Sequence, residues 1–419
     1  MKRKLASATV FALLAVAAQA ASQKPAVAFT FVCNGSPSQR IGTCPNGAQP
    51  NSLIQGSDGN FYGTAWASSE GTSTASGGTV FSLTPAGKFT LLHSFAPGAN
   101  GNFANGRGPI SLTEGADGNL YGLTIGGGNG PGSNFPDYGV TFRVSRTGTG
   151  FKVIHRFCSV GAFCSDGGPS SGPLMAGADG NIYGATSEGG ADIHCPCGTI
   201  FKVTPSSGTY EVVSNFDLAV GEYPYGLTPA PDGTFYGISN EGGKLFDYAP
   251  VTGGLQAAAL SFPFPPGCTG FACFASNVVG FGANGNVYGL YTVYDVGASG
   301  LYEVEPNGGN LHLFPLYNTT ASGGGPIELL RGSDGNLWIT DNTGSSGNGD
   351  IVVLSPSTGK LLHTYAPFST SAAVGAFPSS LIQAKDGTLW GTASDYGVAP
   401  KGHFGGGTVY RMNLGLPPR

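Results

Sequence analysis

DGNFYG, from Asp58 to Gly63, decides the fold, because the same pattern returns six more times along the chain. The later copies begin at Asp117, Asp179, Asp232, Asn284, Asp334 and Asp386. Successive starts are 59, 62, 53, 52, 50 and 52 residues apart. A period of this size over a whole chain indicates a repeat architecture, in which one supersecondary unit packs against the next.

Each repeat contains the residues for four short strands. In the first copy, SLIQG (52–56) and NFYGT (60–64) flank the turn SDGN, where Gly59 supplies a positive φ. TVFSL (79–83), the turn TPAGK and FTLLHSF (89–95) follow as a third strand, a second tight turn and a fourth strand. No helical period is present, so the sequence predicts an all-β fold, a seven-bladed β-propeller of four-stranded antiparallel blades.

The last repeat stops after its third strand, TVYRMN (408–413), and the segment AVAFTFVC (26–33) matches the fourth-strand pattern. We therefore expect the N-terminal strand to complete the seventh blade and to close the ring. Closure removes strand edges that would otherwise pair with other chains. The predicted domain is residues 26–413, followed by a short tail, 414–419.

Residues 1–21 have the pattern of a secretory signal peptide. Lys2, Arg3 and Lys4 precede the apolar run TVFALLAVAA, and Ala18-Gln19-Ala20 forms a cleavage site. The apolar run is too short to span a membrane as a helix, and no C-terminal anchor follows. We expect a secreted or periplasmic monomer.

The charge balance argues against two classes of partner. The formal net charge is −5, and removal of the three basic residues of the signal peptide leaves 16 basic and 24 acidic residues. Charged residues are 10% of the chain and no basic cluster remains, so nucleic acid and anionic membranes are not expected partners.

The eight cysteines form four close pairs, which are Cys33 and Cys44, Cys158 and Cys164, Cys195 and Cys197, and Cys268 and Cys273. An even number in an exported chain predicts disulfide bonds within the pairs. Cys195 and Cys197 have a second interpretation, because a one-residue gap strains a bridge. They could instead bind a metal as thiolates, with His194 as a third ligand.

The repeat also predicts where a ligand binds. The turns after the first and third strands are uniformly short, whereas the loops after the second strands and between repeats are long and variable. Binding sites lie on variable loops held by a rigid scaffold, so we expect a ligand on the long-loop face. Aromatic residues in these loops are candidates for carbohydrate stacking: Trp66, Phe135, Tyr138, Tyr396 and Phe404.

Acidic and histidine side chains on the same face could hold Ca²⁺ or Mg²⁺, or support catalysis. The metal candidates are Glu188, Glu241 and Asp395, and the catalytic candidates are His194, His403 and Glu188. The alternative for the carboxylates is that each caps its own loop. His93, His155, His312 and His363 occupy fourth strands, and we expect structural roles for them, as for the motif Asp in its tight turn.

Two resemblances agree with this architecture. GSDGNFYGT with GGTVFSLTP, and GADGNIYGATSEGG with CGTIFKVTP, resemble the choice-of-anchor tandem repeat GloVer-containing family of exported bacterial proteins. That resemblance implies a propeller-like, surface-associated protein without a defined activity. SDGNLWITD (333–341) is similar to the repeat of streptogramin B lyase, a seven-bladed propeller enzyme that uses a metal and a catalytic histidine. Only the structural motif matches that enzyme.

We favour a non-enzymatic role, in which an exported propeller binds a glycan, a peptide or an envelope component through its long-loop face. The alternative is a metal-assisted lyase or hydrolase with its site at the channel mouth. A third hypothesis is a purely structural envelope protein.

Overall fold

The computed structural model describes residues 25–38, 41–70, 77–98, 101–128, 137–160, 164–191, 194–195, 197–241, 243–260, 273–282, 284–293, 298–318, 326–342 and 347–419. The predicted signal peptide lies outside these residues, as do Phe135 and Cys268. Within the described ranges the regular elements are 28 β-strands. The described residues contain no helix that is long and apolar enough to cross a membrane.

The strands follow the repeats of the sequence. An N-terminal strand, β1 (Ala26–Ser36), precedes them. The first three repeats contain β2 (Ile41–Gln55), β3 (Phe61–Glu70), β4 (Thr79–Leu83), β5 (Phe89–Ser94); β6 (Arg107–Glu114), β7 (Leu120–Gly126), β8 (Val140–Val144), β9 (Lys152–Arg156); and β10 (Ser170–Ala176), β11 (Ile182–Thr186), β12 (Thr199–Thr204), β13 (Thr209–Asn215).

The next three repeats have the same composition, and the last has three strands. They contain β14 (Glu222–Pro229), β15 (Phe235–Glu241), β16 (Lys244–Ala249), β17 (Gly254–Ala259); β18 (Cys273–Phe281), β19 (Val287–Val293), β20 (Ala298–Val304), β21 (His312–Asn318); β22 (Pro326–Arg331), β23 (Leu337–Asp341), β24 (Asp350–Leu354), β25 (Leu361–Tyr365); and β26 (Ala376–Gln383), β27 (Leu389–Asp395), β28 (His403–Met412).

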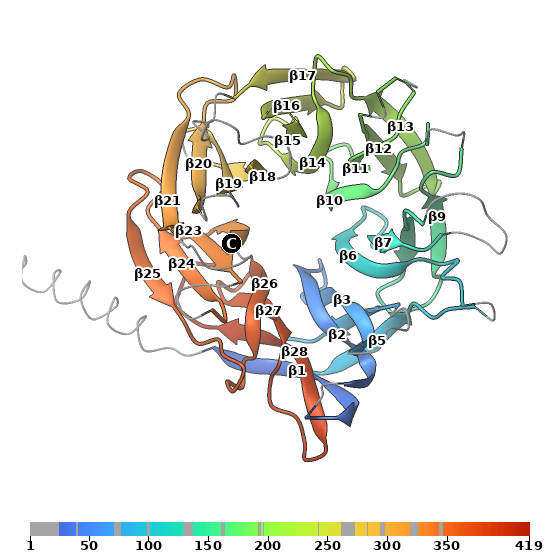
Figure 1. The fold of residues 1–419 in the computed structure, drawn as a ribbon, viewed down its shortest axis with the longest axis vertical. Coiled ribbons are helices and arrows are strands. Elements are labelled where there is room, and N and C mark those ends of the chain that lie inside the picture. The colour runs from blue at the N-terminus through green and yellow to red at the C-terminus, as the bar shows by residue number, and fades with distance from the viewer. Residues whose placement is uncertain are drawn as a thin grey trace, which may run out of the picture.

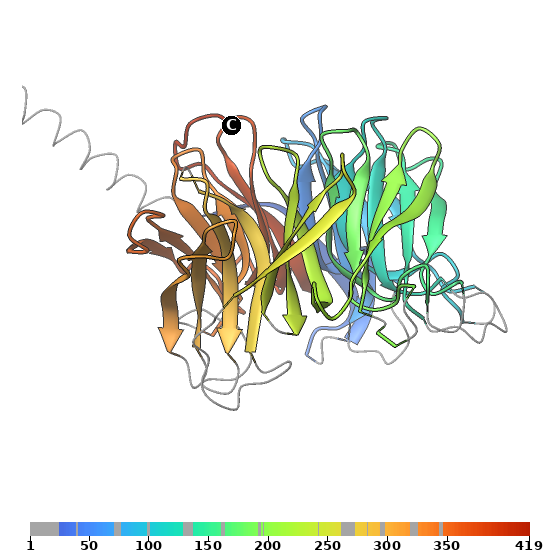
Figure 2. The ribbon, with the colours of Figure 1, turned by 90° about the horizontal axis from the view of Figure 1, so that it is seen from above.

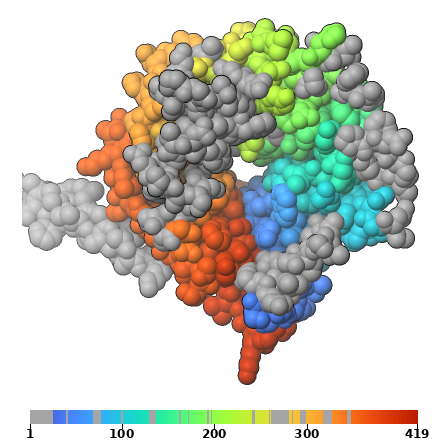
Figure 3. All heavy atoms as spheres, in the orientation of Figure 1, coloured from blue at the N-terminus to red at the C-terminus, as the bar shows by residue number. Residues whose placement is uncertain are grey.

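Antiparallel sheets surround a common centre (Figure 1). The second to sixth repeats each form a four-stranded sheet in chain order, with strands such as β6, β10 and β18 towards the centre and β9, β13 and β17 at the periphery. Seen from the side, the strands run between two faces of the molecule (Figure 2). A narrow opening remains near the middle in the space-filling view (Figure 3). The predicted all-β, four-stranded organisation of the repeats is confirmed.

The first and last repeats differ from this pattern, because they share one eight-stranded sheet of order β26-β27-β28-β1-β2-β3-β4-β5. β1 pairs with β28 from Ala26↔Arg411 to Asn34↔His403. Its last residues, Asn34–Ser36, then pair with the start of β2, and the Cys33–Cys44 disulfide staples this hairpin. We expected a separate sheet for every repeat. The first and last repeats share a sheet because β1 is long enough to pair with β28 along one edge and with β2 along the other.

The motif turn is held by its own aspartate. Asp58 Oδ1 accepts the N–H of Asn60 at 3.1 Å, and Oδ2 accepts the hydroxyl of Tyr62 at 2.7 Å. Burial alone would raise the pKa of Asp58, but these hydrogen bonds outweigh it and the pKa is lowered. Asp117 and Asp179 make the same contacts in their own repeats. The predicted structural role of the motif aspartate is confirmed.

The glycine that ends the motif is explained by its cross-strand partner. Gly63 pairs with Phe81, and a Cβ atom at Gly63 would overlap the Phe81 ring. Gly122 and Gly184 have the same relation to Phe142 and Phe201. The sixth repeat has two side chains of medium size in place of the small and the large one. Ile339 occupies the glycine position, and its cross-strand partner is Val352. Volume conservation across the pair keeps the sheet packed.

Neighbouring repeats are joined by side chains that end the innermost strands, at the position three residues before the motif Asp. We call these contacts clasps. Glu114 Oε2 accepts the N–H of Ser57 at 2.6 Å, and Gln383 Oε1 accepts that of Ser333 at 2.8 Å. Gln55 does the same for Lys385, and Arg331 donates to the carbonyl of Phe281. Glu114 and Gln383 each cap a turn of the preceding repeat, Gln55 caps a turn of the last repeat, and Arg331 binds the end of β18.

We expect Glu114→Ala to lower the free energy of unfolding by about 1–2 kcal/mol, because the Ser57 N–H in a neighbouring turn loses a charged acceptor. Glu114 also accepts the Ser57 hydroxyl at 2.8 Å and lies 3.3 Å from Arg146. Denaturant unfolding followed by fluorescence measures the change. The control is Glu211→Ala, which breaks an ion pair with Lys202 at an exposed carboxylate and should cost under about 0.5 kcal/mol. Equal losses in both variants would contradict the clasp.

Candidate functional site

The long-loop face carries the predicted aromatic residues, and the structure gives them different surroundings. Trp66 follows the part of β3 that pairs with β4 and is 39% exposed. Tyr138 and Tyr396 are partly buried. Phe404 is 5% exposed and packs with Ala48, Ala67 and the Cys33–Cys44 disulfide. The prediction that Phe404 offers a stacking surface is therefore wrong, because its loop continues as β28 beside β1.

Trp66 lies near the inner strand of the second repeat, and we call Trp66, Arg107, Asp137, Tyr138 and Glu188 together the Trp66 surface. A Cβ atom at Gly108, on β6, would lie 3.8 Å from the indole. The adjacent Arg107 donates from Nε and Nη2 to Asp137 Oδ2 at 3.0 and 2.8 Å, and both side chains are about two-fifths exposed. The surface therefore combines an accessible aromatic face with an oriented ion pair.

The Trp66 surface continues to the third repeat through Tyr138 and Glu188. The pKa of Tyr138 is raised, mainly by burial and to a smaller extent by the negative charge of Glu188. The effect of that charge shows that these two predicted residues lie near each other. Glu188 also supplies its backbone carbonyl to Gly168 N–H and to the Thr186 hydroxyl, at 2.8 and 2.9 Å. Its side chain is partly exposed, so the carboxylate can face a ligand while the backbone holds the loop.

The predicted metal and catalytic residues do not meet at one point. Among the described residues, His194, His403, Glu188 and Asp395 do not bring three ligand atoms close together with one another. Asp395 instead accepts the N–H of Tyr396 at 2.7 Å, as a local cap. The side chain of Glu241 lies outside what the structure describes.

The group that the structure does bring together is Cys195, Cys197 and Glu222, with ligand atoms within 4.8 Å of one another. Both cysteines were singled out in the sequence, but Glu222 was missed. It lies a repeat further along, at the start of β14, and no motif marks it. Disulfides join the predicted pairs Cys33–Cys44, Cys158–Cys164 and Cys195–Cys197, whereas the pair of Cys268 and Cys273 lies outside the described side chains.

The histidines predicted to be structural include two whose packing supports that role. His93 stacks on Phe151 with ring centroids 3.6 Å apart, and burial lowers its pKa to about 4. His155 stacks on Tyr210 at 3.7 Å, and its Nε2 lies 3.1 Å from Asp166 Oδ2. Both belong to the packing between neighbouring sheets, so neither is placed to contact a ligand.

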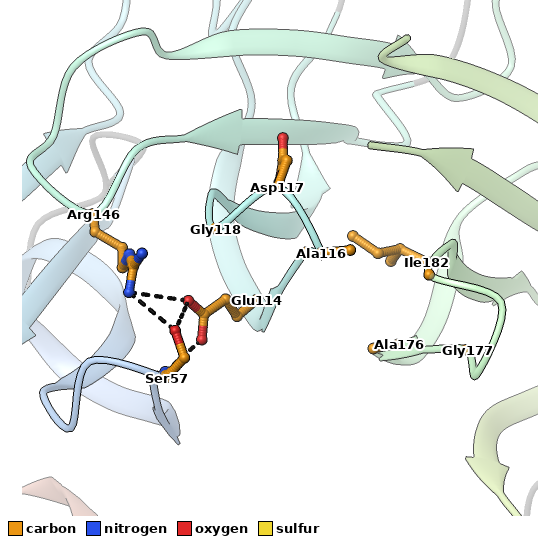
Figure 4. A pocket seen from close by; sticks show the side chains of 11 residues that line it. Ser57, Glu114, Ala116, Asp117, Gly118, Arg146, Ala176, Gly177 and Ile182 are labelled. Carbon is orange, nitrogen blue, oxygen red and sulfur yellow. Dashed lines mark hydrogen bonds and ion pairs between the residues drawn. The ribbon is translucent and has the colours of Figure 1, made fainter. Parts of the chain in front are cut away.

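A cavity of about 570 Å³ lies on the opposite face, among the short turns of the first three repeats. Its wall includes the Glu114 clasp, with Arg146 Nη1 3.1 Å from the Ser57 hydroxyl, and Ala176 lies across from it (Figure 4). Ala176 occupies the clasp position of the third repeat, but a methyl group cannot accept a hydrogen bond or fill the gap. The cavity therefore follows from a missing clasp.

Glu328 is a further titratable group that the sequence did not indicate. It lies on β22, and its Oε2 accepts the N–H of Leu381 on β26 at 3.0 Å. Burial raises the pKa of Glu328 to about 7, although hydrogen bonds from Leu381 and Ser380 favour the charged form. Burial between two inner strands is therefore the main cause of the raised pKa of Glu328.

Comparison with known sequences and structures agrees with the repeat architecture. The family described as the Gloeobacter/Verrucomicrobia repeat matches residues 11–249. No curated protein matches the sequence.

Several solved structures share the fold at low identity. The virginiamycin B lyase from Staphylococcus aureus is 13% identical with a TM-score of 0.55, covering 87% of this chain and 94% of its own. The extracellular domain of a hybrid two-component system from B. thetaiotaomicron is also 13% identical with a TM-score of 0.55, covering 95% of this chain and 44% of its own. A fungal alcohol oxidase in complex with copper is 12% identical, with a TM-score of 0.52, covering 90% and 75%. At these identities the likeness concerns the fold alone.

Glu328→Gln should change how stability depends on pH. The carboxyl keeps its proton up to about pH 7 when folded but only to about 4.5 when unfolded, so its contribution is complete below pH 4.5 and is lost as the pH rises to 7. Over that range the wild type should lose about 3 kcal/mol relative to Glu328→Gln, which still accepts from Leu381. Denaturant titrations at pH 4.5 and 7.5 measure the difference. Parallel pH curves for both proteins would refute the assignment, and Glu211→Gln is the exposed control.

Proposed function

This chain belongs to the Gloeobacter/Verrucomicrobia repeat family. We propose that it is an exported binding protein whose long-loop face binds a component of the cell envelope. A glycan fits the surface best, ahead of a peptide. The observation that carries the proposal is the exposed Trp66, which lies near Gly108, the residue that follows Arg107 of the Arg107–Asp137 ion pair. The opposite face consists of short turns whose polar groups mostly serve the fold.

The scaffold that we infer is a ring of seven blades. Taken with β1, strands β26, β27 and β28 make a unit of four, and β2–β5 make another, so the 28 strands divide into seven units. On this interpretation β1 closes the ring, and its extension onto β2 merges two blades into one sheet. The loops that vary between repeats then lie on one rigid rim, which suits a binding surface.

Export is supported by two independent features. The first 21 residues have the pattern of a cleavable secretory signal peptide. Three of the four cysteine pairs are bridged within the described residues, and disulfides persist in oxidising compartments outside the cytoplasm. The structural likeness to the extracellular domain of a hybrid two-component system is consistent with this location.

The chemistry of the Trp66 surface favours a sugar. An indole offers an apolar face on which the C–H side of a pyranose ring can stack, and it does so with little loss of side-chain entropy. The guanidinium of Arg107 and the carboxylates of Asp137 and Glu188 supply donors and acceptors for hydroxyl groups around that ring. A few polar groups beside an aromatic platform are the usual composition of a small-ligand site.

The alternative is a metal-assisted lyase or hydrolase at the channel mouth, with Ca²⁺ or Mg²⁺. One observation favours it, the raised pKa of Glu328 on an inner strand. It has less support than binding, because His194, His403, Glu188 and Asp395 form no close group with one another among the described residues.

Trp66→Ala should weaken binding to the preferred glycan at least tenfold, since it removes the stacking platform while leaving the sheet intact. The ligand is first selected by screening the mature chain on a glycan array, and affinities are then compared by calorimetry. Leu361→Ala is the matched control, because Leu361 is 54% exposed on the peripheral strand β25 and should leave affinity unchanged. Unchanged affinity in Trp66→Ala would refute the assigned surface.

A further inference from the structure

We propose that the cavity among the short turns of the first three repeats binds a peptide segment that inserts the carboxamide of a glutamine beside Ala176. The inserted carboxamide takes the place of the clasp that the third repeat lacks. This site lies on the face opposite the Trp66 surface, and it does not depend on the function proposed for that surface.

Two of the clasps show what a carboxamide does at this position. Gln55 Oε1 accepts the N–H of Lys385 at 2.8 Å, and its Nε2 donates to the carbonyl of Gly59 at 3.1 Å. The clasp of Gln383 has the same form, since its Nε2 donates to the carbonyl of Gly387 at 3.4 Å. In both, one carboxamide joins a backbone N–H in a turn of the neighbouring repeat to the glycine carbonyl of its own turn.

The third repeat presents the same two backbone groups without the carboxamide. Ala176 stands where those two repeats have glutamine, so the groups left over are the N–H of Ala116 and the carbonyl of Gly180. Neither group forms a hydrogen bond within the part of the chain that the structure describes. All three residues line the cavity of about 570 Å³ (Figure 4), and a Cβ atom at Gly180 would lie 3.6 Å from that of Ala116. The cavity therefore offers a donor and an acceptor at one place.

A carboxamide matches this pair of groups better than other small groups do. Its oxygen accepts from the Ala116 N–H while its nitrogen donates to the Gly180 carbonyl, whereas a carboxylate has no hydrogen to donate. A hydrocarbon pairs with neither group and would leave both without water or a partner, which costs free energy. The same wall contains Ala176 and Ile182, against which the methylene groups of a glutamine side chain can pack.

The charges around the cavity favour a neutral ligand group. Arg146 Nη1 donates to the Ser57 hydroxyl at 3.1 Å and lies 3.3 Å from Glu114 Oε1, so the guanidinium charge is already compensated. Asp117 adds a further negative charge to the wall. A ligand carboxylate would be repelled there, whereas a neutral carboxamide would not.

Arg146 also keeps donors for the backbone of the ligand. Its hydrogen bonds and ion pairs with described residues all go through Nη1, including the contact with Asp58 at 3.8 Å. Its Nε and Nη2 therefore have no acceptor among these residues, and Arg146 lines the cavity. A peptide carbonyl next to the inserted glutamine can accept a hydrogen bond from them.

The chain's own residues 414–419 favour a peptide over a sugar as the ligand. The Pro417 carbonyl accepts hydrogen bonds from Ser333 Oγ at 2.5 Å and from Gln383 Nε2 at 3.0 Å. The N–H of Arg419 donates to the carbonyl of Lys385 at 3.2 Å. A peptide backbone thus pairs with the clasp between the sixth and seventh repeats, whereas no described segment makes such contacts at the third repeat.

The test follows the amide proton of Ala116 by NMR in the mature chain, labelled at alanine, while a peptide is added. The peptide is acetyl-Ala-Pro-Gln-Pro-Ala methylamide, in which glutamine carries the only primary carboxamide. We expect a saturable downfield shift of the Ala116 proton, assigned with Ala116→Ser, because a new hydrogen bond forms there. Peptides with glutamate or methionine in place of glutamine should bind about tenfold more weakly, since each loses at least one of the two hydrogen bonds.

Ala176→Gln supplies the missing clasp from within the chain. It should shift the Ala116 proton downfield without ligand, raise the melting temperature and weaken peptide binding about tenfold. Ser206→Gln adds the same side chain to an exposed turn on the same face, outside the cavity wall, and should bind the peptide as the wild type does.

The proposal is overturned if the glutamine peptide causes no saturable shift in the wild type, or if the methionine peptide binds equally well. Neither comparison needs a variant. Unchanged peptide binding in Ala176→Gln also overturns it. So does a shift of the Ala116 proton caused by N,N′-diacetylchitobiose and not by the peptide, because the cavity would then belong to a sugar.

Discussion

The pairing of β1 with β28 is the constraint on which the rest of the structure depends, because it joins residues from the two ends of the described chain. Without β1, β28 would present a long unpaired edge, which natural sheets avoid. Side chains reinforce the junction of the first and last repeats. Phe61 stacks on Trp390 with centroids 4.0 Å apart, and Ser379 Oγ donates to Pro50 O at 2.7 Å.

Two local rules let one unit be repeated around the centre. The motif aspartate holds its turn and accepts the hydroxyl of the buried motif tyrosine, so the polar end of that ring is satisfied. The motif glycine makes room for the aromatic ring of the third strand. Neither rule involves the long loops, which are therefore free to vary. The Trp66 surface and the cysteine group are both built from such loops and the strand ends beside them.

The sequence predicted the repeat unit well because its signal is local: DGN turns and runs of apolar and β-branched residues act within one sheet. Contacts between repeats were harder to predict. The clasps of Glu114 and Gln383 have no motif of their own, and Glu222 approaches Cys197 only because β14 packs beside the cysteine loop. Burial of Phe404 and the merging of two sheets both follow from the extra length of β1 and β28, which periodicity alone does not reveal.

Closure of the ring by β1 is tested most directly by a disulfide engineered across the β1–β28 pair. Ala26 and Arg411 are exposed backbone partners, and antiparallel partners have Cα separations of about 4.5–5.5 Å, within the range of a disulfide. In Ala26→Cys/Arg411→Cys the account predicts that the bond forms on mild oxidation, is found by peptide mass spectrometry and raises the melting temperature. A folded protein in which both new cysteines stay free would contradict it.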